Sequence, residues 1–439
     1  MYIPVRVKLF ISQILAFSWV GFSVYVALPW IDDLAGTFSL PLALFMVTGI
    51  ALIPGWANAF LVAGLLLDRR PTYLLHDSLP PVTILVAAYN EEDHIGETLA
   101  SIFEQQYPGN VEIIVIDDGS TDKTADVVKM IADETTRVEN RRIVLLSLGK
   151  NGGKSNALNR GLEKASHDII VTQDADTFLF QESLERLIIN LVDGPGNTAA
   201  IAGTVLVRNS RDTILARLQE WDYFLGISVV KRIQSLYQGT LVAQGAFSAY
   251  RKSAIAEAGG WPDTVGEDIV LTWAFHELNY RVGYAENAFA FTRVPETYRQ
   301  LFRQRRRWAR GLIEAFKHHP RILVRPRLVS PFILFNLFFP YLDFVYLTVF
   351  LPGLMAAVFF RYYAIVGLMT LFLLPLMLFI NVVMYYNQVR IFHSHGLRVR
   401  KNVLGAILYV LTYQVMISPA SFAGYISEYL MFQKSWGTK

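Results

Sequence analysis

The sequence predicts an α/β domain enclosed between two membrane regions, and three observations support this fold class. The composition is 53% hydrophobic and 18% charged, against roughly 25% charged residues in an average soluble protein. The apolar residues gather at the two ends of the 439-residue chain. Between them, short β-branched runs alternate with helical patterns, which is typical of a mostly parallel sheet covered by helices.

The N-terminal region, residues 1–70, is expected to form a hairpin of two membrane-spanning helices. No charged residue occurs in 9–31 or in 37–67, and each stretch exceeds the roughly 20 residues that a span needs. Basic residues flank the pair, whereas the link between the spans carries Asp32 and Asp33. Because basic flanks favour the cytoplasmic side, the N-terminus and the middle of the chain are predicted to be cytoplasmic.

The C-terminal region is expected to cross the membrane twice within residues 328–390. Residues 328–351 are apolar except for Asp343, and 362–386 carry no charge. An acidic residue within a span favours a functional role, so Asp343 is a candidate for lining a channel, with helix packing as the alternative.

The last part, residues 391–439, combines a cytosolic loop, an ambiguous apolar segment and a tail. Pro419 lies within the apolar segment, and proline interrupts a helix because it removes a donor and clashes with the preceding turn. Residues 403–432 are therefore predicted to be re-entrant or interfacial, although a simple span is the alternative. A re-entrant segment would keep the tail cytoplasmic.

Residues 71–298 are predicted to form the α/β domain. The expected strands are rich in β-branched residues and cover 82–87, 112–116, 143–147 and 168–172. The helical patterns between them cover 93–103, 124–134 and 154–165. Ligands of such sheets bind beyond the carboxyl ends of the strands, so the residues that follow each strand are candidate site residues.

Charged and polar side chains follow all four expected strands. In chain order they are Tyr89 and Glu91, Asp117 and Asp118, Lys154, and finally Asp174 and Asp176. Ordinary turns and helix caps also favour Asp, Asn, Gly and Ser. Four consecutive loops of this kind at one sheet edge favour a binding site over turn chemistry.

The residue types at this edge suit a metal and a diphosphate. Asp174 and Asp176 are one residue apart, so both lie on the same face of an extended segment. Such a pair suits Mg²⁺ or Mn²⁺, which bridges from carboxylates to substrate phosphates. Lys154 follows a Gly-Gly turn at a predicted helix N-terminus, where a diphosphate is well bound. A nucleotide-sugar donor fits this combination.

Two further motifs follow the sheet region. Glu267-Asp268 precedes an apolar helical run, where the helix dipole alone also favours acidic residues. The basic segment 299–327 directly precedes the membrane, so its alternative role is an interfacial helix on anionic headgroups. Within this segment the second motif consists of Gln304, Arg307 and Trp308.

Composition excludes several other kinds of site and partner. The chain has no cysteine, which rules out a disulfide framework, Cys-ligated zinc and a thiol nucleophile. Its net charge of +3, from 40 basic and 37 acidic residues, gives no support for a nucleic-acid partner.

Together, these motifs resemble the processive family-2 membrane glycosyltransferases, closest to the poly-N-acetylglucosamine, hyaluronan and chitin synthases. The motifs occur in the family's order, and the membrane layout matches over nearly the whole chain. The resemblance implies a cytosolic GT-A-type, Rossmann-like domain. It also implies an inverting enzyme of the plasma membrane that polymerises N-acetylglucosamine from UDP-N-acetylglucosamine and translocates the β-linked product. The alternatives are a hyaluronan or cellulose-type synthase, or a non-processive lipid glycosyltransferase.

The resemblance implies a role for each candidate residue. The nucleotide would be held by Tyr89, Glu91, Asp117, Asp118, Lys154 and Asp174. The divalent metal would be bound by Asp174 and Asp176. The general base would be Asp268, and the growing polysaccharide would contact Glu267 and Trp308. The diphosphate would be contacted by Gln304, Arg307 and, from a gating tail, Trp436.

Two departures from the family pattern are visible. Gly266 precedes Glu267-Asp268 where the family usually has threonine. The C-terminal tail resembles the Trp-Gly-Thr-Arg of hyaluronan synthases, but Lys439 replaces the arginine. The resemblance leaves open whether a small membrane partner subunit takes part.

Overall fold

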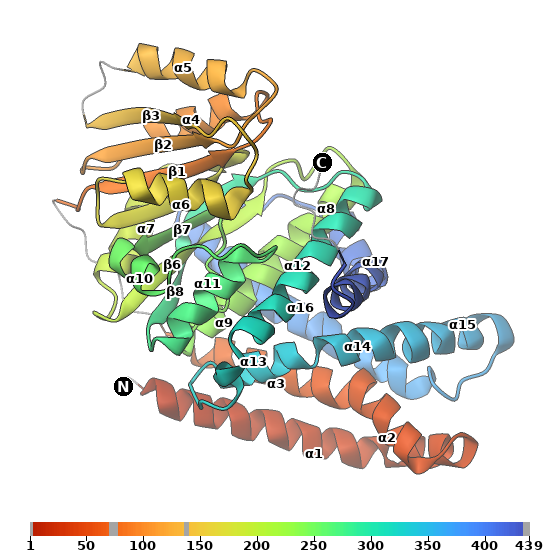
Figure 1. Cartoon of the computed structure of the whole chain (residues 1–439). Coiled ribbons are helices and arrows are strands. Elements are labelled where there is room, and N and C mark those ends of the chain that lie inside the picture. Colours follow the sequence, from red (N-terminus) through yellow and green to blue (C-terminus); the bar gives the residue numbers. More distant parts are fainter. Residues whose placement is uncertain (1–2, 70–77, 136–139, 433–439) are drawn as a thin grey trace.

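The computed structural model describes residues 3–69, 78–135 and 140–432. Its central part is one eight-stranded sheet in the order β3-β2-β1-β4-β7-β6-β8-β5, and the edge carrying β1–β3 lies at the upper left of Figure 1. The strands are β1 (Val82–Ala88), β2 (Val111–Asp117), β3 (Arg141–Ser147), β4 (Ile169–Asp174), β5 (Thr177–Leu179), β6 (Thr198–Val207), β7 (Phe247–Arg251) and β8 (Arg281–Thr292).

Strands β1 to β4 form a parallel set, in agreement with the prediction. β1 pairs in parallel with β2 and β4, and β2 pairs in parallel with β3. All seven residues of β2 are buried, because a parallel strand is covered by helices on both faces. The helices that connect this set are α4 (Ile95–Phe103), α5 (Thr124–Thr135) and α6 (Lys154–Lys164).

The other half of the sheet is mixed. β7 runs antiparallel to β4 and β6, whereas β6 and β8 pair in parallel. A β-branched run indicates a strand but not its direction, so the expected mostly parallel pattern describes β1 to β4 and not the whole sheet. The helices of this half are α7 (Ser183–Val192), α8 (Ile214–Trp221), the π-helical η2 (Asp222–Ile227), α9 (Ser228–Leu236), α10 (Lys252–Glu257), α11 (Glu267–Glu277) and α12 (Tyr298–His318).

The N-terminal helices form the expected hairpin. The chain reverses at residues 38–39, whereas residues 32–33, expected in the link, lie within the first helix. Proline at the start of the second helix suits this turn, because its missing donor is not needed there. The elements are α1 (Val5–Thr37), α2 (Leu40–Val47), the π-helical η1 (Thr48–Leu52) and α3 (Ile53–Leu67).

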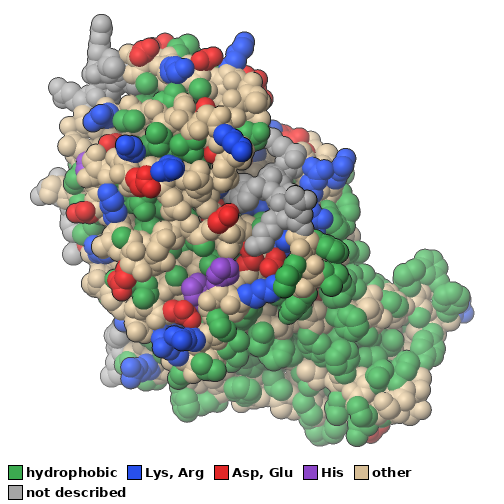
Figure 2. All heavy atoms as spheres, in the orientation of Figure 1, with side chains coloured by type: hydrophobic (Ala, Val, Ile, Leu, Met, Phe, Trp, Pro, Cys, Tyr) green, Lys and Arg blue, Asp and Glu red, His purple; other side chains and the backbone are tan. Residues whose placement is uncertain are grey.

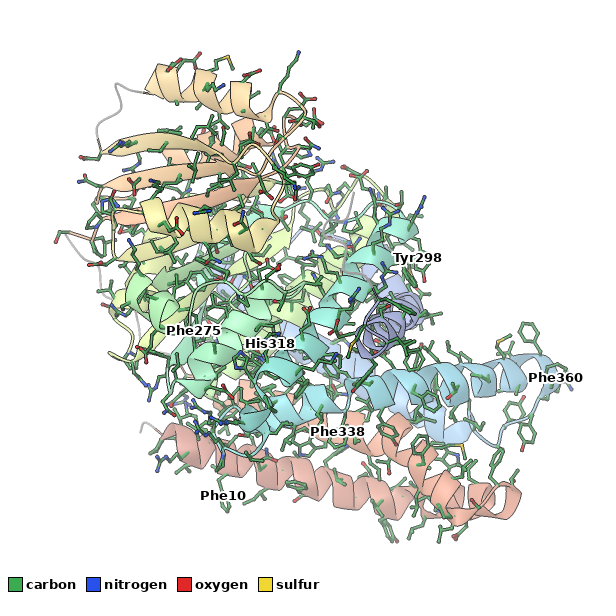
Figure 3. The ribbon with its side chains drawn as sticks, in the orientation of Figure 1. Phe10, Phe275, Tyr298, His318, Phe338 and Phe360 are labelled. Carbon is green, nitrogen blue, oxygen red and sulfur yellow. The ribbon has the colours of Figure 1, made fainter. Side chains whose placement is uncertain are left out.

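Apolar helices extend from the sheet domain and expose their side chains. Figure 2 shows hydrophobic side chains gathered over these helices and charged ones spread over the sheet domain. Phe10 of α1 is 66% exposed and Phe360 is 81% exposed, and both project outward in Figure 3. Among the described residues, four helices are long and apolar enough to cross a membrane: Val5–Thr37, Leu40–Leu67, Phe339–Phe360 and Val403–Tyr429.

The region after residue 327 differs from the expected pair of uninterrupted spans. A separate short helix, α13, ends at Leu337, and the candidate span begins at Phe339. Pro340 lies in the first turn of the new helix, and a helix is readily interrupted before a proline. The remaining elements are α13 (Ser330–Leu337), α14 (Phe339–Val345), the π-helical η4 (Tyr346–Phe350), α15 (Leu351–Phe360) and α16 (Leu368–Ser394).

The last helix, α17 (Val403–Tyr429), runs continuously through Pro419, so the expected interruption was wrong. Asp343 of α14 fixes the helix on both sides of the proline. Its carboxylate accepts hydrogen bonds from Ser418 at 2.6 Å and from Tyr425 at 3.1 Å. Packing against neighbouring helices allows proline to persist within a helix. Asp343 therefore has the helix-packing role that was the alternative to channel lining.

Helix α17 packs in parallel on α12. The Tyr298 hydroxyl donates to the carbonyl of Met416, and Arg310 pairs with Glu428 at 3.3 Å. Both contacts join residues 118 positions apart, so the two helices keep one register over three turns. In Figure 1, α17 is seen nearly end-on, whereas α1 and α14 run across the view.

Candidate active site

Lys154 lies at the centre of a charged cluster at the carboxyl edge of the sheet. It is the first residue of α6, and its ammonium group contacts the Asp174 carboxylate at the end of β4. Its Nζ lies 3.8 Å from Oε1 of Glu267, the first residue of α11. Burial lowers the pKa of Lys154, but the attraction of Asp174 and Glu267 outweighs it and holds the pKa above its usual value. The residue is therefore a permanent cation in this edge.

The carboxylates of this edge repel one another. Burial raises the pKa of Asp176 to about 7, and the charges of Asp174 and Glu91 contribute to the rise. A divalent cation would relieve this repulsion, so the donor set fits Mg²⁺ or Mn²⁺. Within the described residues, no group of three or more His, Cys, Asp and Glu side chains forms a closed metal site. Asp174 and Asp176 are the residues that would hold the cation.

The Glu-Asp motif and the basic motif meet at this edge. Burial raises the pKa of Glu267 to about 7, with Lys154 and Arg307 opposing the rise and Asp268 adding to it. The charges of Lys154, Asp268 and Arg307 thus all act on the Glu267 carboxylate, and the roles assigned to these residues stay predictions.

A direct backbone contact explains the glycine at position 266. A Cβ atom on Gly266 would lie 2.5 Å from the Cα atom of Gly311 in α12. The Gly266 amide also donates to the Glu314 carboxylate at 3.0 Å. Threonine, the usual residue of the family, has no room here. The departure from the family pattern lets α11 and α12 approach closely.

The paired aspartates after β2 support the neighbouring loop. Asp118 accepts hydrogen bonds from the amides of Gly152 and Gly153 at 2.9 and 2.8 Å, which fixes the Gly-Gly turn before Lys154. Burial raises the pKa of Asp118. Asp117 accepts from the Ser120 amide at 3.0 Å. Both aspartates lie at the predicted edge, and their contact with a nucleotide stays a prediction, as does that of the exposed Tyr89.

Trp308 lies on α12 beside a buried ionic network. The Arg305 guanidinium is 4.1 Å from the centroid of the Trp308 ring, a cation–π contact. Arg305 donates to the Asp222 carboxylate at 2.8 Å, and the Tyr413 hydroxyl donates to the same oxygen at 3.0 Å. The indole remains 37% exposed. Arg305 thus contacts the face of the Trp308 ring, while the exposed part of the indole is open to a ligand.

Gln304 lies on α12, one helical turn before Arg307. The residue is buried, and its Oε1 has no hydrogen-bond partner among the described residues. Its contact with a diphosphate stays a prediction. Trp436, the remaining predicted residue, lies outside the described residues.

Sequence reasoning missed three residues of this region. Tyr223 is buried with its ring centroid 6.5 Å from that of Trp308. Lys231 of α9 is buried, and burial lowers its pKa to about 7, with Asp268 opposing the shift. Asp222 opens the π-helical turn η2. None of the three follows a strand or belongs to a motif. π-Helical turns often mark functional sites, but no residue spacing in the sequence predicts them.

The mixed sheet with a cation, clustered carboxylates and an aromatic platform at its edge defines a glycosyltransferase domain of the GT-A type. Residues 83–259 match the family described as Glycosyl transferase family 2. This match lies within the central sheet domain of the chain.

Curated relatives point to one kind of polymer synthase. The chain is 36% identical over 246 residues to the poly-beta-1,6-N-acetyl-D-glucosamine synthase of Staphylococcus aureus strain MSSA476, a match that covers 56% of this chain and 57% of that relative. It is 34% identical over 237 residues to the synthase of the same name from Staphylococcus epidermidis, covering 54% and 55%. The matches thus span little more than half of either relative.

A solved structure shares the fold. The mannosyltransferase PcManGT from Pyrobaculum calidifontis, in complex with GDP-Man and Mn²⁺, aligns with a TM-score of 0.63 and 20% identity. The alignment covers 89% of this chain and 99% of that protein. The likeness includes the helices beyond the sheet domain.

Proposed function

We propose that this protein is a processive, inverting glycosyltransferase that polymerises N-acetylglucosamine from UDP-N-acetylglucosamine into a β-linked polysaccharide. The observation that carries the proposal is the charged cluster of Lys154, Asp174, Asp176, Glu267 and Asp268 at one sheet edge. The relatives named poly-beta-1,6-N-acetyl-D-glucosamine synthase support this donor over UDP-glucose or UDP-glucuronate.

The donor's diphosphate would be held by cationic and amide groups. Lys154 supplies a buried positive charge, and Arg307 of α12 acts on Glu267 of the same cluster. Gln304, one turn before Arg307 on α12, would contact the diphosphate. Asp174 and Asp176 would hold Mg²⁺ or Mn²⁺, which when bound neutralises the charge that develops on the leaving diphosphate. Tyr89, Glu91, Asp117 and Asp118 would line the nucleoside end.

Asp268 would act as the general base. The hydroxyl of the acceptor sugar attacks the anomeric carbon of the donor, the bond from that carbon to the diphosphate oxygen breaks, and UDP leaves. The acceptor proton passes to the Asp268 carboxylate. One displacement inverts the anomeric carbon, and it needs no covalent nucleophile, in keeping with a chain without cysteine.

Trp308 would bind the terminal sugar of the acceptor. An aromatic face suits the apolar face of a pyranose, and the exposed part of the indole offers such a surface. Because the helix that carries Trp308 packs against α17, the growing chain would leave the site beside the membrane helices. We propose that these helices pass it across the plasma membrane, with the catalytic domain on the cytoplasmic side.

Release of UDP by the full-length protein in lipid nanodiscs tests this function. UDP-N-acetylglucosamine, UDP-glucose and UDP-glucuronate are supplied separately and together with Mg²⁺ or Mn²⁺, and the product is sized on a gel. We expect a long product from UDP-N-acetylglucosamine alone, and no UDP release when EDTA removes the metal. Asp268→Asn should abolish turnover, whereas Asp126→Asn, a matched change at an exposed position of α5, should leave it unchanged.

Other outcomes of this assay would indicate one of the alternative functions. A long product only with UDP-glucuronate present indicates a hyaluronan synthase, and one from UDP-glucose a cellulose-type synthase. Short, lipid-linked product alone indicates a non-processive lipid glycosyltransferase. Full activity of Asp268→Asn would refute its role as the base.

A further inference from the structure

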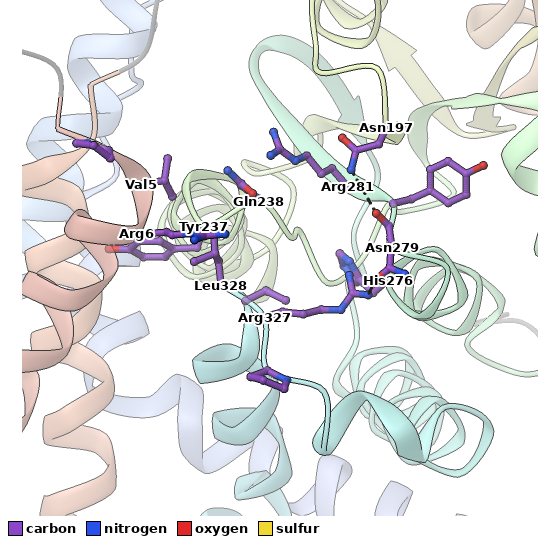
Figure 4. Close-up of a pocket in the computed structure, with 14 residues that line it drawn as sticks. Val5, Arg6, Asn197, Tyr237, Gln238, His276, Asn279, Arg281, Arg327 and Leu328 are labelled. Carbon is purple, nitrogen blue, oxygen red and sulfur yellow. Dashed lines mark hydrogen bonds between the residues drawn. The ribbon is translucent and has the colours of Figure 1, made fainter.

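A cavity of about 820 Å³ lies away from the charged cluster, where the sheet domain meets the N-terminal helix. It is formed by the start of α1, the end of α9, the turn from α11 to β8, and the segment before α13 (Figure 4). Its buried residues include Tyr237, His276 and Val329. Together with Asn197, which precedes β6, these residues make five segments of the chain that line one cavity.

The lining of this cavity is cationic. It contains Arg6, Arg281 and Arg327, and the fourteen lining residues include no aspartate or glutamate. Arg327 donates to the Asn279 side chain at 2.6 Å. The guanidinium groups of Arg6 and Arg281 form no ion pair with any residue in the described ranges. Their charges are therefore available to an anion.

His276 does not add to this charge near neutral pH. Burial lowers its pKa to about 4, and the neighbouring Arg327 contributes to the reduction. Its Nε2 lies 3.0 Å from the Thr240 carbonyl oxygen, which fixes the ring as a neutral donor. The Asn197 side-chain amide donates to the backbone carbonyl of Asn279 at 3.3 Å (Figure 4).

The cavity includes residues at the start of α1, a candidate membrane span. The uncharged stretch of α1 covers residues 9–31, about 35 Å of helix at 1.5 Å per residue, which matches a hydrocarbon core of about 30 Å. Arg6 precedes this stretch by three residues. Arg327 likewise directly precedes the apolar run that begins at Leu328. Arg6 thus flanks a candidate membrane span, and Arg327 lies before α13, twelve residues ahead of the candidate span Phe339–Phe360.

We propose that this cavity binds a phosphate group, and that an anionic lipid headgroup supplies it. Guanidinium groups bind phosphate oxygens in pairs, and basic pockets beside membrane helices on the cytoplasmic side hold anionic headgroups. A bound lipid would connect α1 to the end of α11, whose other end carries Glu267 and Asp268. This site is independent of the donor and acceptor proposed above.

Lipid binding to the full-length protein can be measured by native mass spectrometry. Detergent-purified protein is titrated with phosphatidylglycerol, phosphatidylcholine or glycerol phosphate, and the fraction of protein with a bound molecule is counted. We expect phosphatidylglycerol to bind preferentially, and Arg281→Ala and Arg327→Ala each to weaken it about fivefold. Arg321→Ala, which removes an exposed arginine outside the cavity, should leave binding unchanged.

Three results would overturn the proposal that this cavity binds an anionic lipid headgroup. Equal retention of both lipids, or an equal loss in Arg321→Ala, would show that the cavity does not select a phosphate. Binding of glycerol phosphate as tight as that of phosphatidylglycerol would assign the site to a soluble phosphate and refute the lipid. Arg281→Gln serves as a second, more conservative variant. The melting temperature of each variant in phosphatidylcholine nanodiscs distinguishes a loss of binding from a loss of folding.

Discussion

Lys231 is a buried residue whose surroundings disfavour the charged form of its side chain. It is buried on α9, and its pKa is lowered to about 7 because burial penalises the ammonium form. Asp268 is the charge that opposes this shift. The residue thus changes its charge near neutral pH beside the proposed base.

Lys231→Met should make the stability of the protein less dependent on pH. Unfolded lysine, with a pKa of about 10.4, binds more protons than the folded residue above pH 7, so unfolding becomes less favourable as the pH rises. Between pH 7 and 9 this contribution amounts to at most about 2.7 kcal/mol. Thermal melting at several pH values should show the slope in wild type and a smaller slope in Lys231→Met. Lys129→Met, at an exposed position, is the control, and an equal slope in all three proteins would contradict the lowered pKa.

Arg305 and Asp222 should behave as a coupled pair. Arg305→Met leaves the Asp222 carboxylate buried without a cation, with Tyr413 as its remaining donor, which should cost about 3–5 kcal/mol. Adding Asp222→Asn removes that charge, so the double variant should be more stable than Arg305→Met alone. Denaturation measures this coupling, and additive effects would contradict it. The KM for an N-acetylglucosamine oligomer should still rise in the double variant, because the cation behind Trp308 is absent.

At the scale of elements, the approach of α11 to α12 depends on two glycines. Gly266 and Gly311 leave no space for a side chain between the helices, and this contact places the Glu-Asp motif against the basic motif. Each helix carries one half of the proposed chemistry. Their spacing is therefore as important as the residues themselves.

Gly266→Thr should separate the two helices and lower the stability by about 1–3 kcal/mol, as overpacking does. UDP release should fall with it, because Asp268 and Arg307 move apart. Gly21→Ala is the matched control, since a Cβ there meets no atom within 4 Å. Wild-type melting and turnover in Gly266→Thr would show that the backbone contact is not required.

The sequence allowed the parallel strands and their polar ends to be predicted because both signals are local. A β-branched run followed by Asp174-x-Asp176 can be read within ten residues. Tyr223 and Lys231 could not be found this way, since they reach the site only when η2 and α9, which carry them, pack against the rest of the domain. The interruption predicted at Pro419 was wrong for the opposite reason. The tendency of proline to break a helix is local, and the contacts of α17 with Asp343 overrode it.

At the scale of the whole molecule, the exposed apolar helices require a bilayer. Phe10 and Phe360 are among many large side chains that no other part of the described chain covers. The protein should therefore remain in the membrane pellet after alkaline carbonate extraction and enter solution only with detergent. A peripheral membrane protein from the same cells is the control. Release by carbonate would contradict the assignment of membrane-spanning helices.

The parallel pairing of α12 with α17 also sets an order of events during synthesis. Arg310 leaves the ribosome 118 residues before its partner Glu428, which takes roughly 6–24 s at 5–20 residues per second. During that interval α12 lacks the helix that holds it, and the Asp222–Arg305 pair lacks Tyr413. The nascent chain thus cannot complete the contacts of α12 and of the Asp222–Arg305 pair until α17 has been made.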